Sequence, residues 1–124
     1  MKHLVLSIAM FSGLLLACGT LSAHHGEANY DTTNAVSVTG TVTEVRFINP
    51  HALISLDVKS NKGEIEKWMG EAQSPANLVR NGWNINTIKA GDMISLTGHR
   101  PKNGTNFLRL SKIVLPDGRE LTGL

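Results

Sequence analysis

An apolar stretch opens the chain, and polar and then alternating segments follow it. Lys2 precedes an uncharged apolar run over residues 4–17, and small or neutral residues lead to Ala23. This order of charge, apolar run and small residues is typical of a cleavable secretory signal peptide. The run is shorter than the roughly 20 residues that a membrane-spanning helix needs. We therefore expect residues 1–23 to direct export to the periplasm and then to be removed, and we expect no transmembrane segment.

A second cleavage position lies inside this stretch. Residues 15–19, which include Cys18, loosely resemble a bacterial lipobox, in which the cysteine is lipidated and becomes the first residue. Leu16 is an uncommon residue at its place in such a box, and Ala23 offers an ordinary site. We therefore favour cleavage after Ala23 and keep a lipid anchor at Cys18 as the alternative.

Beyond the signal peptide, alternation with a period of two predicts a β protein. Residues 24–35 are polar and aperiodic, which predicts an extended N-terminal arm. From Val36 onward apolar residues alternate with serine and threonine, and after Val42 the alternation changes parity. Together with Gly40, this shift predicts a long first strand with a bend or bulge, through which one strand serves both halves of a small barrel.

Turn-forming residues divide the rest of the chain into further elements. Pro75, after a capping serine, and Gly82 mark the two ends of a short helix over residues 75–81. Three strands, a helix and two strands predict an all-β fold with one short helix, as a five-stranded OB-like antiparallel barrel over residues 36–124. A meander sheet with one helix is the alternative. The other expected elements are strands at 51–58, 64–72, 93–99 and 107–115 and a last hairpin turn at 117–118.

Charge and cysteine content exclude several classes of protein. The formal net charge is +2, and loss of Lys2, the only charged residue among residues 1–23, lowers it to +1. No run of lysine and arginine indicates a nucleic-acid track or an anionic membrane patch, so we expect no nucleic-acid partner. Cleavage after Ala23 would also remove the one cysteine, which excludes disulfides and thiolate metal sites.

The histidines are the strongest candidates for chemistry. No serine with a base partner, no carboxylate pair and no phosphate-binding glycine loop is evident, so we expect no enzymatic activity. Cleavage after Ala23 would make His24 the first residue, and its amino group and imidazole would form a chelating pair suited to Cu(II), which favours nitrogen ligands in a tetragonal arrangement. His25 is a further candidate ligand. The simpler alternative is that these two histidines are only a polar start of the arm.

Two more histidines favour the metal hypothesis. His51 opens the second predicted strand and His99 closes the fourth, and both fall on the polar parity of their strands. In an OB-type barrel the loops next to them lie at the same end and frame the usual ligand site. We therefore predict a metal site, for copper, formed by His24, His25, His51 and His99. Its role would be metal carriage, buffering or delivery to an exported partner protein.

Two other functions use the same end of the barrel. A metal-free module would bind a small molecule or a partner protein there, and Phe47, Trp68 and Arg100 would then matter. A copper oxidase or oxygenase would need an open metal position and a substrate surface that the sequence does not display. Trp83, directly after the predicted helix, is expected to fill the core.

Several short motifs occur along the chain. They are Ala23-His24-His25, Gly40-Thr41-Val42, Asn49-Pro50-His51-Ala52, Ser74-Pro75 with Leu78, Arg80 and Gly82-Trp83, Gly91-Asp92 and Gly98-His99. With these motifs the chain resembles a family of small exported bacterial proteins of unknown function. Gly26 departs from the pattern, where serine is common, and so does Leu53, where an aromatic residue is common. The resemblance implies a periplasmic domain with His-His at its start, and it implies no reaction.

Overall fold

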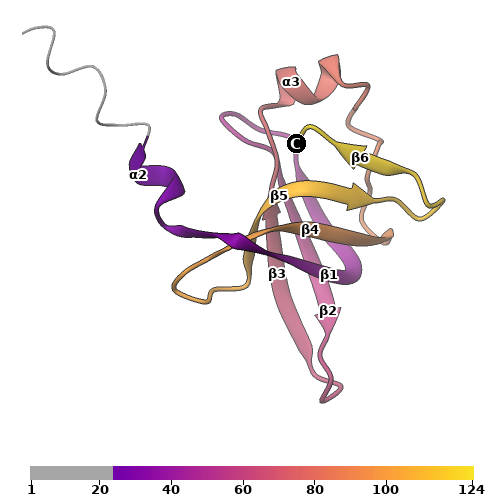
Figure 1. Ribbon diagram of the computed structural model, residues 1–124. Coiled ribbons are helices and arrows are strands. Elements are labelled where there is room, and N and C mark those ends of the chain that lie inside the picture. The colour runs from indigo at the N-terminus through magenta and orange to yellow at the C-terminus, as the bar shows by residue number, and fades with distance from the viewer. Residues whose placement is uncertain (1–23) are drawn as a thin grey trace, which may run out of the picture.

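The computed structural model describes residues 24–124, with side chains from Gly26 onward (Figure 1). The predicted signal peptide, with Cys18 and both cleavage positions, lies outside the described residues. Within residues 24–124, no helix is long and apolar enough to cross a membrane. The elements are α2 (His24–Glu27), β1 (Tyr30–Arg46), β2 (Leu53–Lys59), β3 (Ile65–Glu71), α3 (Pro75–Arg80), β4 (Met93–Pro101), β5 (Phe107–Val114) and β6 (Glu120–Thr122).

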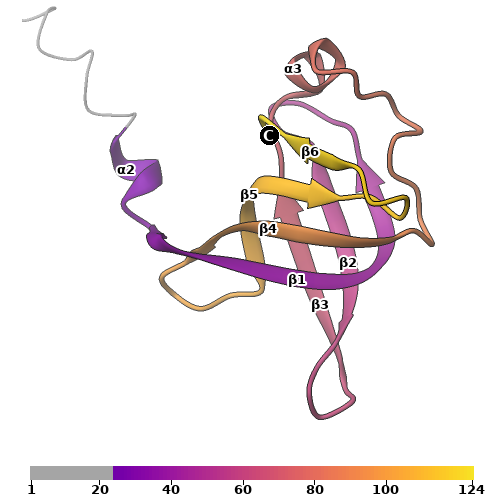
Figure 2. The ribbon, with the colours of Figure 1, turned by 45° about the vertical axis from the view of Figure 1, so that its right-hand side comes forward.

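Five of the strands form a closed ring. The sheet order is β3-β2-β1-β4-β5-β6, and an additional pairing of β3 with β5 joins the two sides (Figure 2). The predicted all-β class with one short helix, α3, is therefore confirmed, and α2 adds only a single turn. The closing pair differs from the antiparallel expectation, because β3 and β5 run parallel. Parallel neighbours need a long crossover, and here α3 and β4 provide it.

Strand β1 bends so that it takes part in both halves of the ring. Its residues 35–41 pair with β4, and its residues 41–46 pair with β2. The register with β2 shifts between Val42 and Glu44, which is the bulge that the change of parity predicted. Gly40 lies against the backbone carbonyl of Asp57, where a Cβ atom would clash. The strand also begins at Tyr30, six residues earlier than predicted, because it continues alongside β4.

The interior of the ring is filled by the apolar faces of its strands. The predicted inward faces of β2 and β4 are buried, and Trp83 is 5% exposed, as expected of a residue that fills the core. Helix α3 covers one end (Figure 1), where Ser74 accepts the N–H of Asn77 as an N-cap and Leu78 is fully buried. The buried set is Val42, Ala52, Ile54, Leu56, Val58, Trp68, Ala72, Leu78, Trp83, Ile88, Ile94, Leu96, Leu108, Leu110, Ile113 and Leu115.

Candidate functional site

His51 lies near the end of the loop between β1 and β2, and its imidazole contacts β3. The Nδ1 atom lies 2.7 Å from Oε1 of Glu71, the last residue of that strand. Backbone hydrogen bonds hold the two segments together beyond their strands, from Ala52 N–H to Gln73 O at 3.1 Å and from Ala72 N–H to Ala52 O at 2.9 Å. Half of the His51 side chain is exposed. The ring is thus fixed in orientation and still open to solvent.

His99 lies on β4 at the point where the register with β1 shifts. Its Nδ1 atom lies 3.0 Å from the backbone oxygen of Asp31. The segment that carries this oxygen is an irregular part of β1, where the Asp31 carboxylate accepts the backbone N–H groups of Thr33 at 3.0 Å and Asn34 at 3.2 Å. A hydrogen bond from the Asn34 side chain and these two backbone bonds lower the pKa of Asp31. This irregular part of β1 therefore supplies the acceptor that orients the His99 imidazole.

Arg109 lies between Glu71 and His99 in the sheet. On β5, it is the register partner of His99 on β4 and of Glu71 on β3. Residues that lie directly opposite each other project to the same face of a sheet. The neighbours of Arg109 along the strand, Leu108 and Leu110, are buried. Glu71, Arg109 and His99 therefore form a row on the outer face of the ring.

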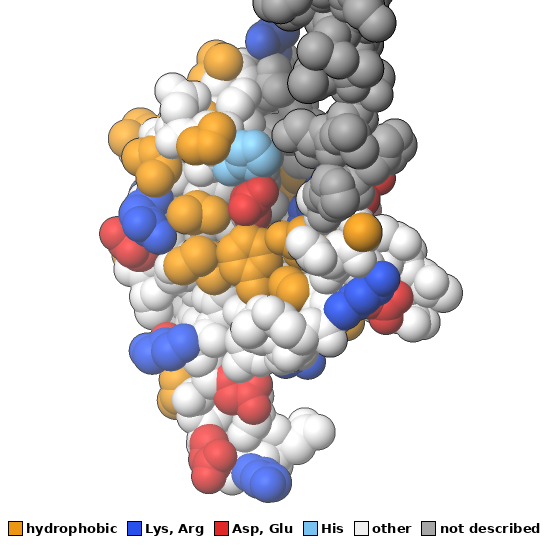
Figure 3. All heavy atoms as spheres, turned by 90° about the vertical axis from the view of Figure 1, so that its left-hand side faces the viewer, with side chains coloured by type: hydrophobic (Ala, Val, Ile, Leu, Met, Phe, Trp, Pro, Cys, Tyr) orange, Lys and Arg blue, Asp and Glu red, His pale blue; other side chains and the backbone are white. Residues whose placement is uncertain are grey.

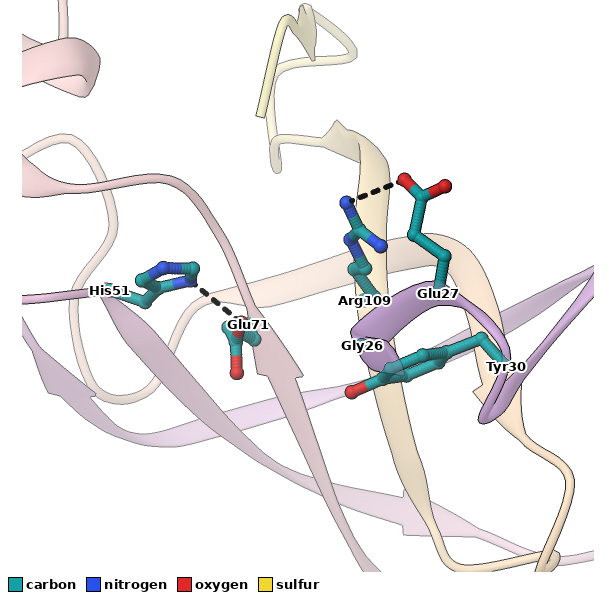
Figure 4. A pocket seen from close by; sticks show the side chains of 6 residues that line it. All are labelled: Gly26, Glu27, Tyr30, His51, Glu71 and Arg109. Atoms are coloured by element: carbon teal, nitrogen blue, oxygen red, sulfur yellow. Dashed lines mark hydrogen bonds and ion pairs between the residues drawn. The ribbon is translucent and has the colours of Figure 1, made fainter. Parts of the chain in front are cut away.

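The N-terminal segment lies beside Arg109 in this row (Figure 4). Glu27 of α2 makes an ion pair with Arg109, with 3.5 Å between its Oε1 atom and Nη2. The Tyr30 ring lies under the same guanidinium, 6.0 Å from its centroid to Cζ. Burial raises the pKa of Tyr30, and the nearby Glu71 carboxylate raises it further, while Arg109 acts in the opposite direction. The phenol, the two carboxylates and the guanidinium thus share one small region.

Three hollows surround Arg109, and it lines each of them. The first has a volume of about 330 Å³ and is lined by Gly26, Glu27, Tyr30, His51, Glu71 and Arg109. The second, of about 440 Å³, is lined by Glu27, Thr32, His99, Arg109, Leu110, Ser111, Gly123 and Leu124. The third, of about 130 Å³, is lined by His51, Glu71, Ala72, Gln73, Arg109 and Leu124. Figure 3 shows a histidine beside a carboxylate on this side of the molecule, with hydrophobic side chains around them.

Two of the predicted site residues, His51 and His99, border different hollows that have Arg109 in common. His51 borders the first and third hollows, and His99 borders the second, with Arg109 common to all. The side chains of His24 and His25 lie outside the described part of the chain. Among the side chains that are described, no three of the His, Cys, Asp and Glu type come together as a metal-binding group. The four-histidine site therefore stays a prediction.

The residues named for the metal-free alternative have structural contacts. Trp68 is 7% exposed, and the Arg100 guanidinium lies over its ring, with 5.0 Å from Cζ to the centroid. Arg100 also donates to the backbone oxygens of Gly104 and Thr105 and to the Asn106 side chain. These contacts hold the loop between β4 and β5 against the ring. They leave little of the Trp68 face for a ligand.

Sequence reasoning missed most of the residues that surround the two histidines. Glu71, Arg109, Glu27 and Tyr30 belong to no motif of the sequence. The alternation of β5 does place Arg109 outside, between buried Leu108 and Leu110. No pattern in the chain, however, says that β3 lies beside β5.

A comparison with protein-family models gives a match over most of the chain. The model of a family of unknown function, DUF6152, matches residues 13–108. No curated protein matches the chain. The match extends from the predicted signal peptide through β4 and into β5, so it includes His24, His25, His51 and His99.

Proposed function

Because the chain belongs to DUF6152, a family of unknown function, we propose its function from its own residues: it is an exported, periplasmic copper-binding module. The proposed ligands are the amino group and imidazole of His24, with His51 and His99, and His25 is a further ligand. The module would carry or buffer copper, or deliver it to an exported partner protein. Cu(II) suits this set, because every proposed donor atom is a nitrogen.

The observation that carries the proposal is the orientation of the two described imidazoles. Each has its Nδ1 atom beside an oxygen acceptor, the Glu71 carboxylate for His51 and the Asp31 backbone oxygen for His99. An Nδ1–H that donates to such an oxygen leaves the lone pair of Nε2 free. Metal-binding histidines in proteins are held in this way by a carboxylate or a backbone carbonyl. Both rings would then offer Nε2 to a metal.

The position of α2 supports His24 as the third contributor. Gly26 and Glu27, two and three residues after His24, line the hollow that His51 borders. The Glu27–Arg109 ion pair and the backbone bond from Lys102 N–H to Asn29 O, at 2.8 Å, fasten this segment to the ring. Cleavage after Ala23 would therefore create a free amino group within a few residues of the hollow. The same cleavage completes the chelating pair on His24.

The test begins with the exported protein. The full chain is produced in a bacterium, the product is recovered from the periplasm, and its intact mass fixes the first residue. Cu(II) is then titrated against a competing chelator for this protein and for the double variant His51→Ala/His99→Ala. We expect the double variant to lose at least 100-fold in affinity. A dissociation constant of the unchanged protein no tighter than that of the double variant would overturn the proposal.

A second protein separates the amino group from the imidazoles. One glycine placed before His24 keeps every histidine and moves the free amino group away from its chelating position. We expect this form to bind Cu(II) at least tenfold more weakly and to show altered electron paramagnetic resonance parameters. Equal affinity and spectra in the two proteins would remove His24 as the chelating residue.

A further inference from the structure

Arg109 is an unusual neighbour for a proposed cation site. Its side chain is 48% exposed and lines all three hollows at this face of the ring. Like charges at close range disfavour each other, so the guanidinium works against a bare divalent cation beside it. Arginine is, however, the residue of choice for binding carboxylates, because its planar fork matches two carboxylate oxygens.

The two carboxylates nearby do not saturate this guanidinium. Glu71 accepts from His51 at 2.7 Å, and it makes no ion pair with Arg109 within the described contacts. Glu27 contacts Arg109 at a single distance of 3.5 Å, and 67% of its side chain is exposed. Arginine has five N–H donors, so most of them have no partner in this pair. An additional anion at Arg109 would use these donors.

The second hollow has the composition that a small organic anion needs. Arg109 and His99 line it, together with Thr32 and with Ser111, whose hydroxyl donates to the backbone oxygen of Thr97 at 3.3 Å. Leu124 supplies an apolar wall. Its volume of about 440 Å³ exceeds that of the first hollow, about 330 Å³. Glu27 and Arg109 line both, so the two hollows adjoin each other.

We propose that the protein binds copper together with a small hydroxy- or amino-carboxylate, whose carboxylate pairs with Arg109 in the second hollow. This inference rests on the copper-binding function proposed above. The anion offsets the combined charge of Cu(II) and the guanidinium, and its hydroxyl or amino group meets the side chains of Thr32 and Ser111. The cargo is therefore a metal complex of a small carboxylic acid, and Arg109 is the residue that selects for the acid.

The experiment uses glycolate as the probe and glycolamide as its neutral counterpart. Each is titrated by calorimetry into the exported, processed protein with one equivalent of Cu(II) and into the same protein without metal. We expect glycolate to bind the copper-loaded protein at least tenfold more tightly than the metal-free protein. Glycolamide should bind neither form measurably. Equal binding of glycolate and glycolamide to the loaded protein would overturn the inference.

Three variants assign the effect to Arg109. Arg109→Gln should lose at least tenfold in glycolate affinity of the loaded protein, and Arg109→Lys, which keeps the charge without the fork, should lose less. Arg119→Gln changes an exposed arginine that pairs with Asp117 in the β5–β6 turn, and it should bind glycolate unchanged. Thermal melting checks that each variant is folded. Unchanged glycolate binding in Arg109→Gln would overturn the role of Arg109.

The two proposals fail in different ways. If the processed protein does not bind Cu(II), the proposed function is wrong and the cargo inference falls with it. If Cu(II) binds through the histidines and glycolate binds independently of Arg109, only the carboxylate inference is wrong. Electron paramagnetic resonance separates these outcomes, because it reports the nitrogen ligands whether or not glycolate is present.

Discussion

His51 and Glu71 lie on different strands of the ring, and the Nδ1 atom of His51 approaches Oε1 of Glu71 to 2.7 Å. The contact joins the loop after β1 to the end of β3. It also leaves the Nε2 atom of the imidazole directed away from its partner, since the two ring nitrogens lie on opposite edges of the imidazole. Glu71, which the sequence does not distinguish from other surface carboxylates, thereby sets which imidazole nitrogen of His51 is available to a ligand.

Glu71→Gln should weaken copper binding. The amide keeps an oxygen acceptor and removes the negative charge, so His51 becomes a poorer and less firmly oriented ligand. Loss of a side chain that hydrogen-bonds to a metal-binding histidine typically lowers metal affinity 10–100-fold, and we expect a loss of about tenfold here. A competition titration with Cu(II) measures it. Glu44→Gln, which changes a carboxylate of β1 that lies 3.9 Å from Arg46, is the control. Equal affinities of the two variants would show that Glu71 does not act on the metal site.

Asp31 makes the stability of the arm depend on pH. Hydrogen bonds from Asn34 and Thr33 lower its pKa in the folded state, so the carboxylate form favours folding. This contribution is complete above the ordinary carboxyl pKa of about 3.9 and is lost as the pH falls through the lower folded value. Asp31→Asn keeps an acceptor without a charge, and it should therefore lose less stability than the unchanged protein on acidification.

Urea unfolding at pH 7 and at pH 3 measures this difference. At pH 7 the Asp31→Asn variant should be the less stable protein, and at pH 3 the gap should narrow. Glu64→Gln, which removes a carboxylate from the turn before β3, controls for the loss of one charge. A gap that widens at pH 3 would contradict the assignment to Asp31.

Local patterns were sufficient to predict most of the fold. The parity change after Val42 predicted the bulge of β1, and the alternation of β2 and β4 predicted which of their residues are buried. The serine and proline at residues 74 and 75 predicted where α3 begins. In each case the residues that carry the pattern lie within a few residues of the feature that they predict. Such features depend on backbone preferences and on the period of the strand.

Contacts between distant strands could not be predicted in this way. Glu71 and Arg109 become neighbours only through the parallel pairing of β3 with β5, which 35 intervening residues of loop, helix and strand separate in sequence (72–106). No periodicity records that register. His51 and His99 were found because histidine is rare and chemically distinctive, whereas an outward-facing glutamate or arginine on a strand resembles any solvated residue.

Ile113→Ala should destabilise the ring strongly. Ile113 is fully buried on β5, so truncation removes apolar contacts and leaves a cavity. Substitutions of this kind cost about 2–5 kcal/mol. The control is Ile85→Ala, which shortens a side chain that is 71% exposed in the loop after α3 and should change stability by less than about 0.5 kcal/mol. Denaturant unfolding of both variants decides the comparison, and similar losses would contradict the assignment of the core.

Gly98→Ala should separate β4 from β5 beside the candidate site. Gly98 is buried where the register with β5 shifts, and an added Cβ atom would clash with the backbone carbonyl of Arg109 and reach Leu110 Cα at 3.0 Å. The contact is with backbone, so the strands themselves must move, and overpacking of this kind costs about 1–3 kcal/mol. His99 follows directly in the chain, so its amide signal and that of Arg109 should shift in nuclear magnetic resonance spectra. Gly26→Ala, whose added Cβ meets no atom within 4 Å, is the matched control. A Gly98→Ala protein as stable as the unchanged one, with both signals in place, would show that β4 and β5 do not approach this closely.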